Sequence, residues 1–589
     1  MRHYNTIVQA ILVFCAALTT AGTALYYVVG FGWMSMLVAV GTAACITIMS
    51  LRGAERRSNP EIASVTAFPR NDVLAALLIL ALDAIALALL IMYRSDDALR
   101  SPWEVLPATY FIIFWSASAL LLFVARTKYI LPLAMLHTFI GWSVALMVYK
   151  LGYGFDPFIH QAAEKFIAAH GAITPKTPYY IGQYVMVVTL NRFGVPIDLA
   201  DRWLLPLLAS ISVPYVLSRV RHNLSVFATL LPATAFIMTT PQGLGNLWLL
   251  LTAFTLERPV LGIIFALAAT ATHPIAGIPA LALIAFTRVQ RWYFRTPIFL
   301  ATILALPIAF SFRNFTTIKP HLPTLAHSLL PVIQNHFDWP LDFVYLIGNN
   351  LWIIIVALAA IGFWRSRRYP HLLTAAALFA SYLIMTSLLN FSGLISYESG
   401  IFPARLLEVA AIALLPLAAE GILFLFRPGL PYVILAASLM TTSMYLTYPR
   451  VDRYDKNQGR SVSASMVRAV HRIEDQPHPR RYIVLADQNA AAVQIHDYGF
   501  KTYYRGNYFY SHPSGGLDLY RFFQKMVEEV QPTREIATAA MDFAGVDELY
   551  LVVPDYWKTF RRVVSIAKQE ADDWTALDDG KVMLFRFTK

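Results

Sequence analysis

Long apolar runs separated by short polar groups fill the first three quarters of the chain. A helix needs about 20 apolar residues to cross the ~30 Å hydrocarbon layer of a membrane, and shorter runs suffice when a helix is buried among others. The pattern therefore predicts about fifteen spans. They lie near 7–30, 32–51, 73–93, 109–125, 129–150, 199–220, 224–240, 242–257, 259–272, 274–288, 294–312, 351–364, 372–389, 405–426 and 431–448. The division at 272–274 follows from His273 and Pro274, because a proline breaks a continuous helix.

Short basic groups between these runs predict the orientation. With a cytoplasmic N-terminus, every such group lies on the cytoplasmic side, as the positive-inside rule requires. The groups are at 52–57 and 70, 126–128, 219–221, 288–295 and 365–368. Because successive spans alternate in direction, the loops 94–108, 151–198, 313–350 and 390–404 are then outside, together with everything after Tyr448. We therefore expect a multi-pass protein of the plasma (inner) membrane.

The tail after residue 449 has a different pattern, in which helical and strand periods alternate. Helices are expected at 463–474, 517–530, 533–545 and 556–571, and strands at 481–486, 549–553 and 582–587. This predicts a soluble, extracytoplasmic α/β domain over 449–589. The remaining chain divides into additional N-terminal spans over 1–128 and a membrane core over 129–448.

Composition supports a membrane protein, because 57% of the residues are hydrophobic and only 14% are charged. The net charge of +11 does not indicate nucleic acid, because Lys and Arg lie in short groups rather than on one basic face. Both cysteines, Cys15 and Cys45, lie inside apolar runs, so no disulfide framework is expected. The first apolar run lacks a cleavage site and is interpreted as an uncleaved span.

The first large outer loop contains the most informative polar pattern. Asp156 followed by Pro157 is typical of a helix start, in which the aspartate caps and the proline occupies the first turn. On that helix Asp156, His160 and Glu164 are four residues apart and share one face. These groups suit acid/base chemistry or a divalent metal such as Mg²⁺ or Mn²⁺. Capping alone is the competing interpretation of Asp156.

The wider loop resembles a known family. The segments FDPF at 155–158, AHG at 169–171 and PYYIGQY at 178–184 are similar to the first external loop of the GT-C class of membrane glycosyltransferases, with the nearest likeness to the catalytic subunit of oligosaccharyltransferase. The resemblance implies that Asp156 is a catalytic, metal-binding carboxylate. With it we assign His160 to catalysis, and Glu164, Tyr180 and Tyr184 to substrate binding.

The resemblance continues over 129–448. ADRWLLPLLA at 200–209 looks like the second core span of the family, and IFPARLLE at 401–408 is similar to the helix whose arginine holds the lipid-linked phosphate. Arg405 matches that arginine. An arginine at the outer boundary can donate two hydrogen bonds to a phosphate. A simple interface arginine is the alternative.

Two departures from the family pattern affect the expected chemistry. The family carries a second acidic motif between two core spans, whereas the equivalent segment here, TTPQGLGN at 239–246, has no carboxylate. Hard divalent cations prefer several anionic oxygens, so metal dependence is in question, and Gln242 with Asn246 suits sugar hydroxyls instead. The acceptor motif WWDYG is also missing, and HDYG at 496–499 is interpreted as a turn after a helix.

Asp83 lies in the middle of a predicted span, where an ionised carboxylate is costly. His137 in the 129–150 span is the expected partner, in a structural hydrogen bond.

The leading hypothesis is therefore an enzyme that transfers a sugar from a polyprenyl-phosphate donor at the outer membrane face. A protein that binds lipid-linked glycan without catalysis is the first alternative, because of the absent second carboxylate. A secondary transporter is the second alternative, because the chain has many spans and an intramembrane carboxylate.

Overall fold

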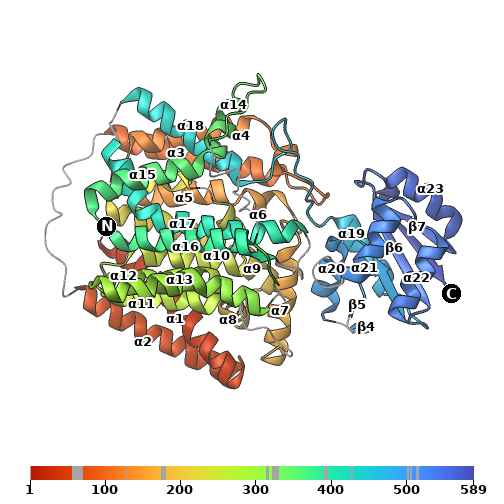
Figure 1. Ribbon diagram of the computed structural model, residues 1–589. Coiled ribbons are helices and arrows are strands. Elements are labelled where there is room, and N and C mark those ends of the chain that lie inside the picture. The colour runs from red at the N-terminus through yellow and green to blue at the C-terminus, as the bar shows by residue number, and fades with distance from the viewer. Residues whose placement is uncertain are drawn as a thin grey trace. The chain divides into compact units, whose positions relative to one another are not determined.

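The chain forms two compact units in a computed structural model, which describes residues 2–55, 70–125, 127, 129–173, 181–231, 233–313, 317–320, 331–390, 396–425, 429–500, 503–504, 507–511 and 517–589. The helical unit contains 1–93, 101–148 and 164–457, and the α/β unit contains 94–100, 149–163 and 458–589 (Figure 1). The α/β unit thus includes two short segments that the sequence pattern assigned elsewhere. The reason is packing, because Phe158 and Ala162 share one apolar core with Val462 and Met466.

The described part of the helical unit contains seventeen α-helices besides the end of α7 (Asp156–His170). Their bounds are α1 Arg2–Val29, α2 Trp33–Glu55, α3 Arg70–Met92, α4 Thr109–Phe123, α5 Ile130–Trp142, α6 Val144–Val148, α8 Ile181–Arg192, α9 Ile197–Val220, α10 Pro241–Phe254, α11 Pro259–Thr272, α12 Pro274–Arg288, α13 Trp292–Arg313, α14 Leu341–Asn349, α15 Leu351–Ser366, α16 Tyr369–Leu388, α17 Ser396–Leu425 and α18 Leu430–Thr447. Helix α1 packs against α8, α9 and α11, so the predicted N-terminal addition belongs to the same packed unit as the core.

Eight described helices are long and apolar enough to cross a membrane, and a ninth span results if the bent pair α14 and α15 counts as one. The structure therefore supports a helical membrane protein but does not confirm about fifteen spans. Five of the predicted spans correspond to the short helices α4, α5, α10, α11 and α12, of 13 to 15 residues. At 1.5 Å per residue they measure about 20–23 Å, which is less than the hydrocarbon thickness.

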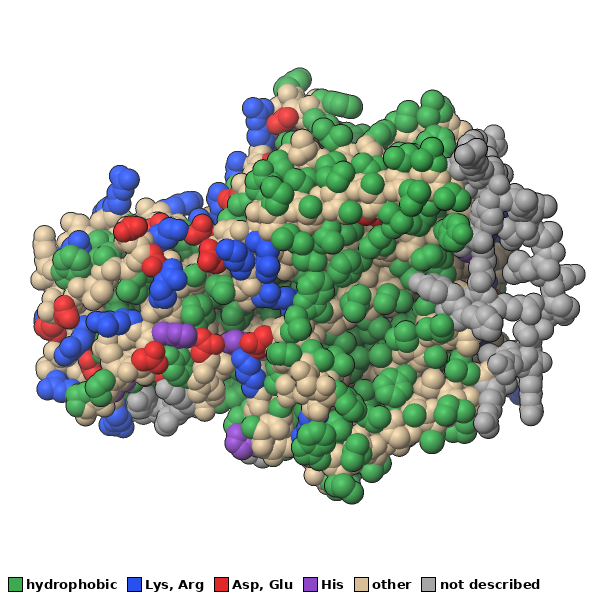
Figure 2. Space-filling model, turned by 180° about the vertical axis from the view of Figure 1, so that it is seen from behind, with side chains coloured by type: hydrophobic (Ala, Val, Ile, Leu, Met, Phe, Trp, Pro, Cys, Tyr) green, Lys and Arg blue, Asp and Glu red, His purple; other side chains and the backbone are tan. Residues whose placement is uncertain are grey.

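Apolar side chains cover most of the face of the helical unit that Figure 2 shows. Exposed examples on its helices include Leu77, Ile112 and Val260. A continuous apolar surface of this kind is unfavourable in water, and lipid contact is the environment that suits it.

The prediction of a helix break at His273 is confirmed. Helix α11 ends at Thr272 and α12 begins at Pro274, with His273 in an extended conformation between them. Its Nδ1 accepts a hydrogen bond of 3.2 Å from the backbone N–H of Ile275, and the proline occupies the first turn, where no donor is needed.

The prediction of a helical span at 224–240 is wrong. The chain there forms the 3₁₀ helices His222–Leu230 and Thr234–Phe236 instead of an α-helix. It still returns along α9, because Thr239 donates to the backbone oxygen of Asp201 and accepts from the N–H of Leu205. The 3₁₀ helix His222–Leu230 packs against α5, α9 and α18, and enclosure of this kind allows non-α backbone inside a helical membrane protein.

The predicted pairing of Asp83 with His137 is confirmed. His137 Nδ1 lies 2.9 Å from Asp83 Oδ1, and its Nε2 lies 2.8 Å from Ser118 Oγ. All three side chains are buried, and the ring of Phe114 stacks on the imidazole at 4.3 Å. This chain of hydrogen bonds joins α3, α5 and α4.

The α/β unit contains a four-stranded sheet in the order β3–β6–β8–β7. The strands are β3 Tyr482–Leu485, β6 Glu548–Pro554, β7 Asp573–Leu577 and β8 Val582–Thr588, and only β3 and β6 are parallel. Its helices are α19 Ala464–Glu474, α20 Gln488–Tyr498, α21 Leu517–Phe523, α22 Arg534–Ala544 and α23 Phe560–Glu570, and two short strands, β4 Tyr503–Tyr504 and β5 Asn507–Tyr508, form a separate pair. The sequence pattern missed β7, because this edge strand is largely exposed and lacks an apolar alternation.

Candidate functional site

The two predicted catalytic residues lie on the first turns of α7. Asp156 is the first residue of this helix and is exposed, and His160 is half-buried one turn later. The residues up to Ala163 belong to the α/β unit, whereas Glu164 belongs to the helical unit. A catalytic role for Asp156 and His160 stays a prediction of the resemblance.

Glu164 is the predicted site residue for which the structure gives a defined set of polar partners. The Nε2 of Gln183, on α8, donates to Glu164 Oε1 at 3.1 Å and to Asp201 Oδ1, on α9, at 2.9 Å. All three side chains are fully buried. One amide group therefore bridges two carboxyl groups that come from separate helices.

Electrostatics in this cluster favour a retained proton. The pKa of Glu164 lies well above its ordinary value of 4.5, first because burial disfavours the charged form and second because Asp201 is a like charge. The hydrogen bond from Gln183 acts in the opposite direction. Glu164 Oε2 and Gln183 Oε1 are buried without a hydrogen-bond partner among the described residues. Burial and the nearby carboxyl group of Asp201 therefore favour the protonated form of Glu164.

Several helices begin at the end of the bundle that holds Glu164, Gln183 and Asp201, and their backbones pack closely there. An added Cβ at Gly182 would lie 2.6 Å from Thr272 Oγ1, and one at Gly245 would lie 3.1 Å from the Cβ of His273. The α8 residue before Gln183 thus meets the end of α11, and α10 meets the start of α12. Asn246, the next residue on α10, is buried, and neither of its amide atoms has a partner within the described ranges.

Three of the remaining predicted residues, Gln242, Tyr184 and Arg405, lie on α10, α8 and α17. Gln242 is half-buried in the first turn of α10, and its neighbour Gly243 packs against Leu205. Tyr184 is buried on α8, and Arg405 is half-buried on α17. Tyr180 lies outside the described residues.

The structure offers little support for the expected divalent metal. Over the ranges described above, no group of three or more His, Cys, Asp or Glu side chains is close enough together to hold a metal ion.

Gln183 and Asp201 are the members of the cluster that the sequence-based assignment missed. Both lie inside segments that carry the family resemblance, Gln183 in PYYIGQY and Asp201 in ADRWLLPLLA. The available signal was a carboxylate at the start of an apolar run, which is costly unless it is paired. Its partners come from 18 and 37 residues earlier in the chain, so no local spacing reveals them.

The catalytic prediction for Asp156 is tested by two substitutions. Asparagine caps a helix about as well as aspartate, so Asp156→Asn should keep the stability of the protein, whereas Asp156→Ala should lose about 1 kcal/mol. If the resemblance holds, Asp156→Asn should reduce sugar transfer by about 10²-fold. Thermal unfolding and transfer rate are measured on the same preparations. Near-normal transfer by Asp156→Asn together with a less stable Asp156→Ala would show that this residue only caps the helix.

Compared with known proteins, the chain matches no family model, and neither a curated protein nor a solved structure is similar to it.

Proposed function

We propose that this protein is a membrane glycosyltransferase of GT-C type, which transfers a sugar from a polyprenyl-phosphate donor to an acceptor at the outer membrane face. The observation that carries the proposal is the buried carboxyl pair of Glu164 and Asp201, bridged by Gln183. Glycosyl transfer to a hydroxyl group needs a base that receives the hydroxyl proton, and paired carboxyl groups supply this chemistry.

In the proposed reaction, the acceptor oxygen forms a bond to the anomeric carbon while the bond from that carbon to the phosphate oxygen breaks. The polyprenyl phosphate leaves with the bonding electron pair, and the hydroxyl proton moves to Asp201. Glu164 keeps its own proton throughout, because burial and the neighbouring charge oppose its ionisation. Because both carboxyl groups are buried, substrate binding has to open this end of the bundle.

The direct test uses the purified protein in liposomes with lipid-linked sugars extracted from the host cells. Mass spectrometry should show loss of one polyprenyl-phosphate sugar and appearance of the free polyprenyl phosphate. Cells without the gene should accumulate the same donor. If no lipid-linked sugar is consumed in vitro and none accumulates in the cells, the transferase proposal is wrong.

A proton-coupled transporter is the second candidate, because buried carboxyl groups inside a helical membrane bundle also bind the transported proton in such proteins. The carboxyl pair and the Asp83–His137 contact are the observations that favour it. The variant Glu164→Gln separates the two functions. It imitates the protonated side chain and should allow transfer, whereas a carrier that must protonate and deprotonate Glu164 would lose solute-driven proton uptake.

Arg405 provides a further test of the donor. If its guanidinium binds the phosphate through two hydrogen bonds, Arg405→Ala should raise the KM for the lipid donor by about 100-fold. Arg405→Lys keeps the charge without the planar fork, so its KM should be intermediate. Both values come from initial rates at varied donor concentration in mixed micelles. Equal KM values for the three proteins would identify Arg405 as an interface anchor only.

A further inference from the structure

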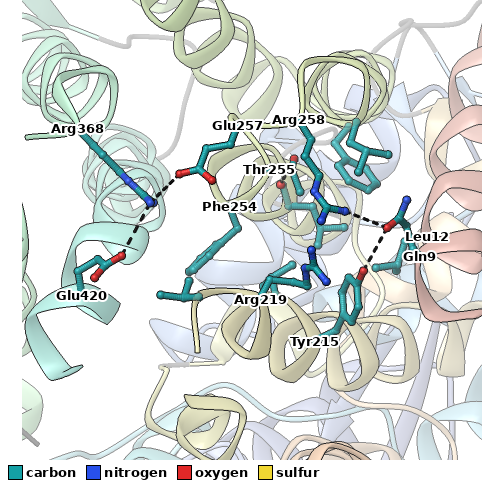
Figure 3. Close-up of a pocket in the computed structure, with 15 residues that line it drawn as sticks. Gln9, Leu12, Tyr215, Arg219, Phe254, Thr255, Glu257, Arg258, Arg368 and Glu420 are labelled. Carbon is teal, nitrogen blue, oxygen red and sulfur yellow. Dashed lines mark hydrogen bonds and ion pairs between the residues drawn. The ribbon is translucent and has the colours of Figure 1, made fainter. Parts of the chain in front are cut away.

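A second polar site lies at the opposite ends of α9 and α10. Here a pocket of about 270 Å³ opens between the end of α9, the connection from α10 to α11, and the start of α1 (Figure 3). Asp201 and Arg219 are 18 residues apart on α9, which corresponds to about 27 Å along the helix. The pocket is therefore separate from the carboxyl pair, and it lies at the end of the bundle that the basic loops predict to be cytoplasmic.

The charges in this pocket are not balanced. Three arginines and two glutamates line it, and both glutamates face the same arginine. Arg368 lies 2.8 Å from Glu257 and 3.8 Å from Glu420. On the other side of the pocket no carboxylate faces Arg258 or Arg219 among the described lining residues.

The two uncompensated arginines lie beside neutral hydrogen-bonding groups. Arg258 donates to the amide oxygen of Gln9 at 3.2 Å, and the Tyr215 hydroxyl donates to the same oxygen at 3.5 Å. Arg219 makes no hydrogen bond or ion pair with a described residue, it interacts electrostatically with Tyr215, and Figure 3 shows it in the same part of the pocket as Tyr215 and Arg258. The Arg219 guanidinium and the N–H groups of Arg258 that Gln9 does not accept can donate to the oxygens of a phosphate group.

Apolar side chains complete the wall around these groups, including Leu12, Val216 and Phe265. The volume is close to the lower limit of small-ligand sites, about 300 Å³, so the pocket fits a headgroup and the first part of a chain rather than a whole lipid. A ligand that contacts both the arginines and the apolar wall of the pocket carries a phosphate ester and an apolar group.

We propose that this pocket binds the phosphate headgroup of an anionic phospholipid, held by Arg219 and Arg258 at the predicted cytoplasmic end of the helical unit. The proposal is independent of sugar transfer at the other end. An anionic lipid belongs to the membrane that surrounds this end of the protein, and a cation pair at this depth attracts its headgroup over that of a zwitterionic lipid.

The test measures lipid binding to the full-length protein in detergent by native mass spectrometry. Phosphatidylglycerol should bind to the wild type more tightly than phosphatidylcholine. The variant Arg219→Gln/Arg258→Gln should raise the apparent Kd for phosphatidylglycerol about tenfold or more, because both charge-assisted contacts are lost. Arg219→Lys/Arg258→Lys should be intermediate, which keeps the proposal testable if the glutamine variant is poorly folded.

Arg291 is the matched control, because it lies between α12 and α13 at the same end of the bundle but does not line the pocket. Arg291→Gln should leave the Kd unchanged. The proposal is overturned if Arg291→Gln weakens binding as much as the double variant does, or if phosphatidylcholine binds equally well. Displacement of the lipid by millimolar inorganic phosphate would also overturn it, because the site would then recognise a free anion.

Discussion

Replacing Asp201 by asparagine is expected to reduce sugar transfer by about 10³-fold while the protein stays folded. An asparagine oxygen still accepts the hydrogen bond that Gln183 donates, so the cluster keeps its geometry. The amide cannot receive the acceptor proton, so the chemical step loses its base. Transfer is measured in single-turnover experiments with saturating donor, which separate the chemical step from binding.

Glu164→Gln is the matched control for this substitution. The glutamine side chain imitates the protonated carboxyl group that the proposal assigns to Glu164, and its oxygen accepts from Gln183 as well. This variant should retain most of the transfer rate. If Asp201→Asn transfers at the normal rate, Asp201 is not the base; if both variants lose activity equally, the assignment of one base and one acid within the pair is wrong.

Glu164→Gln should also change how the stability of the protein depends on pH. The pKa of Glu164 is raised above 4.5 in the folded state, so the folded protein binds this proton more tightly than the unfolded chain does. The contribution of Glu164 to stability is therefore fully present below pH 4.5 and is lost as the pH rises toward the folded-state pKa. Glutamine does not titrate, so the unfolding midpoint of Glu164→Gln should fall less over that range. Parallel curves for both proteins would contradict the raised pKa.

In the helical unit, the hydrophobic pattern predicted where most helices lie but not the backbone conformation of every segment. The pattern located helices at almost all of the predicted spans, and it placed the break at His273 correctly, because proline and a long apolar run act locally. It failed at 224–240, where the side chains are as apolar as those of a helix. A 3₁₀ backbone is possible there because other helices enclose the segment. The local sequence does not show which elements will surround a segment.

At the candidate site, the sequence predicted which polar residues are neighbours on one helix but not which ones come from other helices. Periodicity on one helix grouped Glu164 with Asp156 and His160, because the spacing of four is visible in the sequence. The actual partners of Glu164 are side chains on α8 and α9, which tertiary packing brings to it. For Asp83 the cost of an unpaired charge inside an apolar span predicted a polar partner, and His137 is that partner in the structure.

Removing the imidazole of His137 is expected to cost about 3–5 kcal/mol, because Asp83 then keeps a buried carboxyl group without its hydrogen-bond partner. Asp83 Oδ2 already lacks a partner among the described residues, so the carboxyl group has no alternative contact in place. His137→Leu also removes the contact to Ser118, but Ser118→Ala alone should cost only about 1 kcal/mol.

A double-mutant cycle isolates the pair. Asp83→Leu/His137→Leu replaces both polar groups by apolar ones, so it should be more stable than the sum of the two single losses implies, with a coupling energy of about 2 kcal/mol. The measurement is reversible unfolding in mixed detergent micelles, with Ser118→Ala as the control for loss of one hydrogen bond. Additive losses in the cycle would mean that the contact between α3 and α5 does not stabilise the bundle, and that Asp83 is held at this depth by something other than His137.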